Sequence, residues 1–157
     1  MKRWLLYGIL FAAAVFIPVD STDVGKLHPV QAVSVGYYNE EVVLKTDTGE
    51  IGRGETPELA LENLKQTAPA IIYLDTAEYL LVEDSAFEFV APLRKFLKSD
   101  VRICRIEPEV EVDKAAKYLR IHGKLPKLKQ WNRGENLPVL MLQNERIILS
   151  ENLQKKS

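Results

Sequence analysis

The segment from Gly54 to Asp100 most constrains the fold of this chain, because helical and strand-like patterns alternate within it. Thr56-Pro57 is typical of a helix start, with a side-chain oxygen at the N-cap and proline at the first helical position. Ala68-Pro69 ends that helix, since proline lacks an amide donor and disfavours helix in the residue before it. Ile71 to Leu74 then predicts a short buried strand, and Tyr79 to Val82 a second apolar run. The alternation predicts a layered α/β core.

A second helix, a strand and a third helix continue the pattern. Asp84-Ser85 is the expected cap of the second helix, and Val101 to Ile106 predicts a strand. Asp113 is the expected cap of the third helix over 114–122, which Gly123 closes. The second helix carries a wide apolar stripe made of Ala86, Phe89, Val90, Leu93, Phe96 and Leu97.

Hairpin patterns flank these elements on both sides. The β-rich runs 30–35 and 42–44 surround a turn at Tyr38-Asn39-Glu40, and Glu50 to Gly54 predicts a short third strand. The runs 137–142 and 146–149 predict a second hairpin around Asn144-Glu145. The sequence therefore predicts one α/β (α+β) domain over residues 30–150, with a mixed sheet and about three helices.

Residues 1–19 carry the pattern of an N-terminal signal or anchor helix. Lys2-Arg3 precede a charge-free apolar run from Trp4 to Val19. As a helix this run would span about 24 Å, against a hydrocarbon core of ~30 Å. That length fits a single-pass anchor in the cell membrane, which we favour, or a signal whose cleavage leads to secretion. Both place the domain outside the cytoplasm, with residues 20–29 as a tether and 151–157 as a polar tail.

The overall composition excludes several function classes. A net charge of −1 lacks the basic excess of a nucleic-acid-binding domain. The single Cys104 cannot form an intramolecular disulfide and is expected to be a small buried core side chain. His28 and His122 are too isolated to ligate a catalytic metal, and no Ser/His/Asp or Cys/His set is present for nucleophilic catalysis. We therefore expect a non-enzymatic protein without a cofactor or metal.

Two loops resemble the aspartate loops of aspartic proteases. Asp47-Thr48-Gly49 and Leu74-Asp75-Thr76-Ala77 would have to pair their carboxylates to activate water. Their short separation and the polar neighbours of Asp47 favour a hairpin turn and a strand end instead. An aspartic-type hydrolase is therefore only a remote alternative. Gly52-Arg53-Gly54 resembles half of a phosphate cradle but lacks the lysine and spacing of a P-loop, so a flexible turn is the favoured interpretation.

A row of four acids alternates with Pro108, Val110 and Val112 after the strand that ends at Ile106. On an extended chain, all four carboxylates would lie on one side and could hold a hard cation such as calcium. The favoured interpretation is an edge segment whose charges prevent pairing with another sheet. The four acids are Glu107, Glu109, Glu111 and Asp113.

The basic segment, residues 114–133, is the strongest candidate for a binding surface. It contains no acid, and Tyr118, His122 and Trp131 are interleaved with its cations. Outside a membrane it could contact anionic lipid or wall polymer, face the acidic row, or form a solvated helix face that needs no partner. The candidate polyanion- or partner-binding residues are Lys114, Lys117, Arg120, Lys124, Lys127, Lys129 and Arg133.

The order of elements over residues 30 to 122 is similar to that of a known family. It is carried by the segments 61–69, 71–74, 79–82, 92–97 and 101–106, and it resembles the N-terminal domain of the C subunits of spore germinant receptors. The resemblance implies a spore-former-type domain without a catalytic role, anchored on the outer side of a membrane beside a polytopic receptor partner. The lipid-accepting cysteine of that family, the tryptophan-containing motif after it and the further domains are absent.

These observations lead to two main functional hypotheses. The first is a non-enzymatic accessory or assembly module, anchored in the membrane by Trp4 to Val19, that acts through protein–protein contacts and is linked to sporulation or germination. Its expected partner is a polytopic membrane protein. The second is a surface module that binds anionic lipid or wall polymer through residues 114–133.

Overall fold

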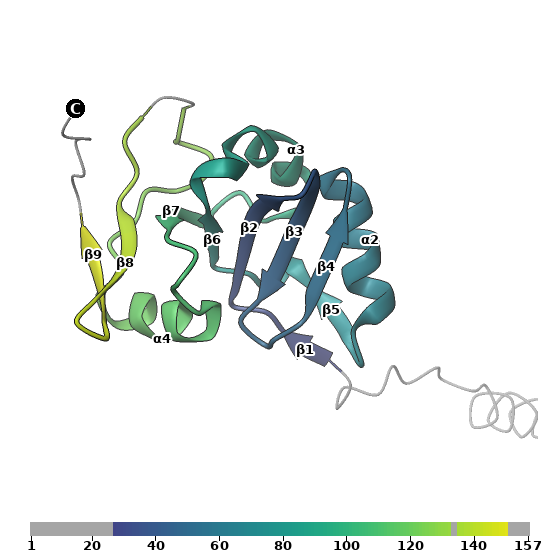
Figure 1. Ribbon diagram of the computed structural model, residues 1–157, viewed down its shortest axis with the longest axis horizontal. Helices are drawn as coiled ribbons and strands as arrows, with labels where there is room; N and C mark the ends of the chain where they lie inside the picture. The colour runs from purple at the N-terminus through teal and green to yellow at the C-terminus, as the bar shows by residue number, and fades with distance from the viewer. Residues whose placement is uncertain (1–26, 133–134, 151–157) are drawn as a thin grey trace, which may run out of the picture.

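The computed structural model describes residues 27–132 and 135–150, which form one α+β domain around a seven-stranded mixed sheet (Figure 1). The strand order is β4-β3-β2-β6-β7-β8-β9. The pairs β2–β6, β6–β7 and β7–β8 are parallel, whereas the pairs β2–β3, β3–β4 and β8–β9 are antiparallel. The strands are β2 (Ala32–Tyr38), β3 (Glu41–Thr46), β4 (Ile51–Gly54), β6 (Tyr79–Val82), β7 (Arg102–Ile106), β8 (Val139–Gln143) and β9 (Arg146–Ser150). The mixed sheet is therefore confirmed.

The expected anchor 1–19, the tether up to residue 26 and the tail 151–157 lie outside the described residues. In the part of the chain that the structure describes, no helix has the length and apolar character needed to cross a membrane.

Helices cover both faces of the sheet. α2 (Pro57–Thr67) and α3 (Val90–Leu93) lie on one face, and α4 (Val112–His122) lies on the other (Figure 1). Along β6, Leu80 and Val82 pack on the α2 face and Tyr79 and Leu81 on the α4 face. Because both faces are covered, β6 is buried along its whole length, as is usual for a central parallel strand. Cys104 lies in the α4-side core and is buried, as the sequence predicted.

α2 packs directly on the edge strand β4, and this contact requires glycine. A Cβ at Gly52 would lie 2.2 Å from the carbonyl oxygen of Ala60, and one at Gly54 would lie 2.5 Å from its amide nitrogen. The interpretation of Gly52-Arg53-Gly54 as a flexible turn is therefore wrong, because this segment is a strand selected for close approach. Asn63 of α2 also accepts a hydrogen bond from the Arg53 amide at 3.0 Å, which covers the sheet edge.

β5 (Ile71–Tyr73) lies outside the main sheet. It pairs in parallel with β1 (Leu27–Pro29), so the end of the segment assigned to the tether forms a strand. The expectation of a buried strand is wrong for two of its three residues, because Ile71 is 47% exposed and Tyr73 is 36% exposed. The 3₁₀ turn η2 (Leu74–Thr76) follows directly.

The expected second helix is broken into three pieces. The 3₁₀ turns η3 (Asp84–Phe89) and η4 (Arg94–Phe96) flank the single turn of α3. Asp84 and Ser85 do not cap this helical segment, because both side chains interact with residues of the sheet instead. The Asp84 carboxylate pairs with the Arg105 guanidinium of β7, and the Ser85 hydroxyl accepts from the Tyr37 amide at 3.2 Å. Tertiary contacts therefore replace the local cap.

The other helix ends and the hairpins follow local rules. Thr56 caps α2, accepting from the Leu59 amide at 3.3 Å, and the Gly123 amide closes α4 on Leu119 at 2.8 Å. The expected cap at Asp113 is wrong: α4 begins two residues earlier than predicted, at the buried Val112, so Glu111 occupies the N-cap position. Both predicted hairpins are confirmed. Their two-residue turns have positive φ at both positions, the geometry that suits the twist of paired strands, at Asn39, Glu40, Asn144 and Glu145.

Candidate functional site

Two of the three cations on α4, Lys114 and Lys117, form ion pairs with acids at the start of the helix. The Lys114 ammonium lies 2.9 Å from Glu111, and the Lys117 ammonium lies 3.2 Å from Asp113. Both pairs are exposed and belong to the i,i+3 and i,i+4 spacings that are common on helix surfaces. The acidic row and the basic segment therefore do meet, but only through neighbours on one helix.

The loop part of the basic segment is fixed on the opposite face of the sheet. Leu128 and Trp131 are buried in the core that α2 covers. The Arg94 guanidinium donates to the carbonyl oxygens of Leu128 at 3.1 Å and Trp131 at 2.6 Å. The seven candidate cations therefore do not come from one face. Arg120, Lys124, Lys127 and Lys129 form no ion pair with another described residue, and Arg133 lies outside the described residues.

The acidic row is not an extended edge segment. The Val110 amide donates to the Glu107 carbonyl oxygen at 3.0 Å, so residues 107–111 form a turn between β7 and α4. The prediction of an extended edge segment is therefore wrong. Within residues 27–132 and 135–150, no three His, Cys, Asp or Glu side chains gather closely enough to hold a metal ion.

The two aspartate loops line different cavities. Asp47 lies in the turn after β3, where its Oδ1 accepts from the amides of Gln31 at 2.9 Å and Ala32 at 3.1 Å. It thereby fixes the start of β2, as expected for a turn aspartate. Asp75 lies in η2 after β5 and lines the apolar groove described below. The structure does not pair the two carboxylates.

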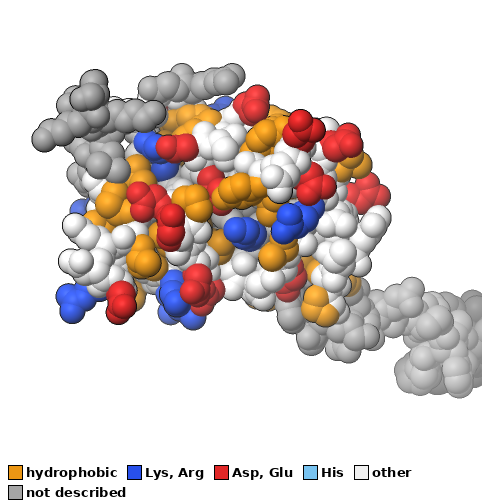
Figure 2. Space-filling model, viewed as in Figure 1, with side chains coloured by type: hydrophobic (Ala, Val, Ile, Leu, Met, Phe, Trp, Pro, Cys, Tyr) orange, Lys and Arg blue, Asp and Glu red, His pale blue; other side chains and the backbone are white. Residues whose placement is uncertain are grey.

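A groove on the α4 face contains the one acid in the buried core of the described chain, Glu83. Two cavities of about 410 and 350 Å³ share Glu83, Ile106 and Pro108 in their walls, and we call them together the Glu83 groove. It begins at the carboxyl ends of β2, β6 and β7, the usual ligand position in sheets with parallel strands, and reaches the Asp47 turn. In the same view as Figure 1, Figure 2 shows acidic and basic side chains interspersed over the visible face of the molecule.

The Glu83 carboxyl group is held in a fixed place. It is only 5% exposed, and its Oε2 accepts from the Tyr38 hydroxyl. Gly36 makes room for it, because a Cβ there would lie 2.8 Å from the Glu83 carboxyl carbon and 2.7 Å from the Tyr38 ring. Burial, and secondarily the negative charge of Glu109, raises the pKa of Glu83 from 4.5 to about 7. A buried acid with a pKa near neutrality is typical of functional sites.

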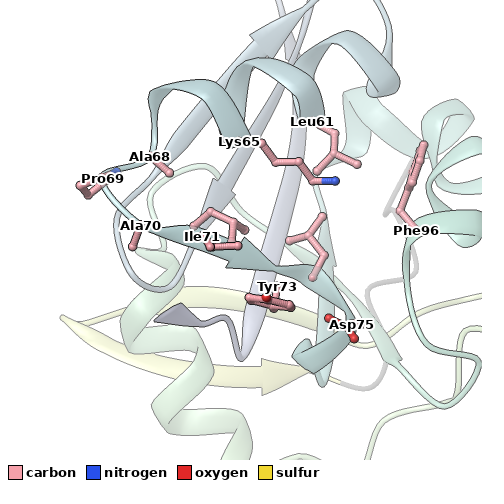
Figure 3. Close-up of a pocket in the computed structure, with 11 residues that line it drawn as sticks. Leu61, Lys65, Ala68, Pro69, Ala70, Ile71, Tyr73, Asp75 and Phe96 are labelled. Carbon is pink, nitrogen blue, oxygen red and sulfur yellow. The ribbon is translucent and has the colours of Figure 1, made fainter. Parts of the chain in front are cut away.

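An apolar groove opens between α2 and β5. Its volume is about 650 Å³, and Figure 3 shows Leu61 and Lys65 of α2 on one side of β5, with Phe96 at one end. Ile71 and Tyr73 are the β5 residues of its wall that are most exposed. The remaining wall is mostly apolar and consists of Ala68, Pro69, Ala70, Ile72, Leu74 and Asp75. The exposure of Ile71 and Tyr73 makes this groove an uncovered apolar surface.

Comparisons with family models, with curated proteins and with solved structures give no significant match to this chain.

Sequence reasoning missed both grooves. Glu83 stands directly before the expected helix cap at Asp84-Ser85, and Ile71 and Tyr73 lie in a run that was predicted to be a buried strand. The sequence Ile71-Ile72-Tyr73 is apolar at every position, so it contains no alternation with a period of two that could have indicated a surface strand.

Proposed function

We propose that this chain is a non-enzymatic, membrane-anchored accessory module outside the cytoplasm that binds a polytopic membrane protein through the apolar groove. The observation that carries the proposal is the exposure of Ile71 and Tyr73 on a groove of about 650 Å³ with mostly apolar walls. Uncovered apolar surface of this kind is typical of protein-binding sites. The resemblance to germinant receptor subunits favours sporulation or germination as the process.

The path of the chain supports a partner in the membrane. β1 pairs with β5 from Leu27 opposite Ile71 to Pro29 opposite Tyr73, so the groove wall lies beside the first described residues. The tether from Asp20 to Lys26 spans at most about 25 Å when fully extended. An anchor formed by Trp4 to Val19 would therefore keep the groove close to the membrane surface, where a polytopic protein exposes its extracytoplasmic loops.

Site-specific photocrosslinking in native membranes tests the proposal. A photoreactive residue replaces Ile71 in the tagged full chain, and the matched control replaces Ile121, which is 75% exposed on α4. We expect a polytopic membrane protein to be recovered at near-equal yield from position 71 and not from position 121. Ile71→Glu should abolish that product and Ile121→Glu should keep it. Equal crosslinking from both positions would contradict the assignment of the groove.

A second candidate function, binding of anionic lipid or wall polymer, rests on the loop cations. Lys124, Lys127 and Lys129 are exposed and form no ion pair with another described residue, so their charge is available to a polyanion. The triple reversal to glutamate should remove salt-sensitive binding to anionic vesicles or wall material while partner recovery stays unchanged. Loss of partner recovery in this variant would instead assign the loop to the protein interface.

A further inference from the structure

The Glu83 groove has the size and position of a small-molecule site. Its two cavities, about 410 and 350 Å³, each fall in the range of ligand pockets, and they are adjacent because they share three wall residues. An elongated ligand that occupies both would pass these shared residues, of which Glu83 is one. The apolar groove shares no wall residue with them, so the Glu83 groove is a separate site.

Glu83 presents one unused acceptor in this groove. Its Oε2 is occupied by the Tyr38 hydroxyl, whereas its Oε1 accepts no hydrogen bond from a described residue. A buried polar atom without a partner costs free energy, and a buried carboxylate costs more. The absence of a side chain at Gly36 leaves the space that the Glu83 carboxyl group and the Tyr38 ring occupy. A donor supplied by a ligand would satisfy Oε1.

The charged groups facing Glu83 leave the groove negative. Arg105 of β7 is engaged with Asp84, so its charge is compensated. The Lys45 ammonium of β3 lies 6.0 Å from the Tyr38 ring centroid. The remaining charged groups of the groove are acidic. Glu111 and Asp113 at the start of α4 are paired with Lys114 and Lys117, and Glu50 lies after β3. Asp47 after β3 and Glu107 and Glu109 after β7 form no ion pair with another described residue, and they outnumber the Lys45 ammonium.

The aromatic rim suits a cation as well. Tyr37 and Tyr38 line the cavity of about 350 Å³, and the Tyr37 ring packs against Phe89 with ring centroids 5.1 Å apart. Aromatic faces attract ammonium groups through their quadrupole, most strongly where water is partly excluded. Carboxylates spread along a groove rather than gathered at one point match a ligand whose positive charges are also separated.

We propose that the Glu83 groove binds an organic cation with two or more primary ammonium groups, of the polyamine class, and that one ammonium group donates to Glu83 Oε1. A second ammonium group lies toward the Asp47 turn, in the other cavity. Binding holds Glu83 in its ionised form, so it releases a proton near neutral pH. Affinity should therefore rise about tenfold between about pH 6 and about pH 8, because the pKa of Glu83 in the free protein is about 7.

Isothermal titration calorimetry of the full chain in a mild non-ionic detergent tests the proposal. Putrescine and spermidine are the probes, and 1,4-butanediol is a neutral probe of the same length as putrescine. Glu83→Gln keeps the size of the side chain and should weaken spermidine binding about tenfold or more, as expected for loss of a charge-assisted hydrogen bond. The control Glu62→Gln removes an exposed acid on α2 and should bind as the unaltered protein does.

Several results would overturn the proposal. Any one of four results is sufficient: no binding at millimolar spermidine, the same spermidine affinity in Glu83→Gln as in the unaltered protein, binding of 1,4-butanediol, or a spermidine affinity that does not change with pH. A lysine tripeptide that binds more tightly than spermidine would overturn the small-molecule assignment, because it would identify a basic protein segment as the source of the ammonium groups. Glu83→Gln removes a buried ionisable group rather than packing, so it is expected to remain folded.

Discussion

Replacement of Glu83 by glutamine is expected to stabilise the folded protein at alkaline pH and to leave its stability unchanged at acid pH. The pKa of Glu83 is raised from 4.5 to about 7, mainly because burial disfavours the charged carboxylate. The folded state therefore holds this proton more firmly than the unfolded state does. The stability that Glu83 contributes is fully present below about pH 4.5 and is lost as the pH rises through about 7.

The size of the effect follows from the same shift. One pKa unit corresponds to about 1.4 kcal/mol, so complete ionisation of Glu83 costs the folded state about 3 kcal/mol as an upper limit. Relaxation of the groove around the charged group reduces this cost. We therefore expect the free energy of unfolding of Glu83→Gln to exceed that of the unaltered protein by about 1–3 kcal/mol at about pH 8. In Glu83→Gln, the side-chain amide oxygen can still accept the hydrogen bond that the Tyr38 hydroxyl donates to Glu83.

Urea unfolding of the full chain in a mild non-ionic detergent measures the difference. The buried Trp131 provides a fluorescence signal for loss of the core. Unfolding midpoints at about pH 4 and about pH 8 are compared with those of Glu62→Gln, whose side chain is exposed. Equal stabilisation by Glu83→Gln at both pH values would refute the reasoning, because the gain would then not come from ionisation. Destabilisation at about pH 8 would refute it too.

Three further predictions concern stability and reactivity. Gly52→Ala should lower the free energy of unfolding by about 2–4 kcal/mol, because the added Cβ meets the Ala60 carbonyl oxygen, and a midpoint shift in urea measures it. Thr56→Ala should cost about 1 kcal/mol through loss of the α2 cap, whereas an unchanged midpoint would show that the cap is dispensable. Burial raises the pKa of the Cys104 thiol, so a thiol reagent should label the unfolded protein and not the native one, and rapid native labelling would contradict this burial.

Features set by neighbouring residues could be predicted from the sequence. The cap at Thr56, the Gly123 helix end and the turns at Asn39-Glu40 and Asn144-Glu145 are all local, and the structure has each of them. The strands of the main sheet were predictable for the same reason, since continuous apolar runs indicate strands with two buried faces. Their order, with β2 beside β6, depends on contacts distant in sequence.

Features set by distant residues were not predictable in the same way. Asp84 has the local appearance of a helix cap, but Arg105 engages its carboxylate and the helix breaks into 3₁₀ turns. Glu83 beside it has the local appearance of a surface acid. Its burial requires the missing side chain at Gly36 and the ring of Tyr38, which no pattern around position 83 contains. The candidate site was therefore hidden because its parts meet only in the folded chain.

The two proposed sites should act independently, and a pair of variants can show it. The apolar groove packs with the α2-side core and the Glu83 groove with the α4-side core, and no wall residue is common to them. Sites without shared contacts usually contribute additively, within about 0.5 kcal/mol. Ile71→Glu should therefore abolish partner crosslinking and change spermidine affinity less than about twofold.

Glu83→Gln should have the opposite pair of effects, weakening spermidine binding while the crosslinked product keeps its yield. The double variant should lose both activities by the amounts seen in the single variants. A loss of spermidine affinity in Ile71→Glu that matches the loss in Glu83→Gln would contradict independence. It would mean that β5 and the Glu83 groove are energetically coupled through β2, the strand whose start lies beside η2 and whose end carries Tyr38.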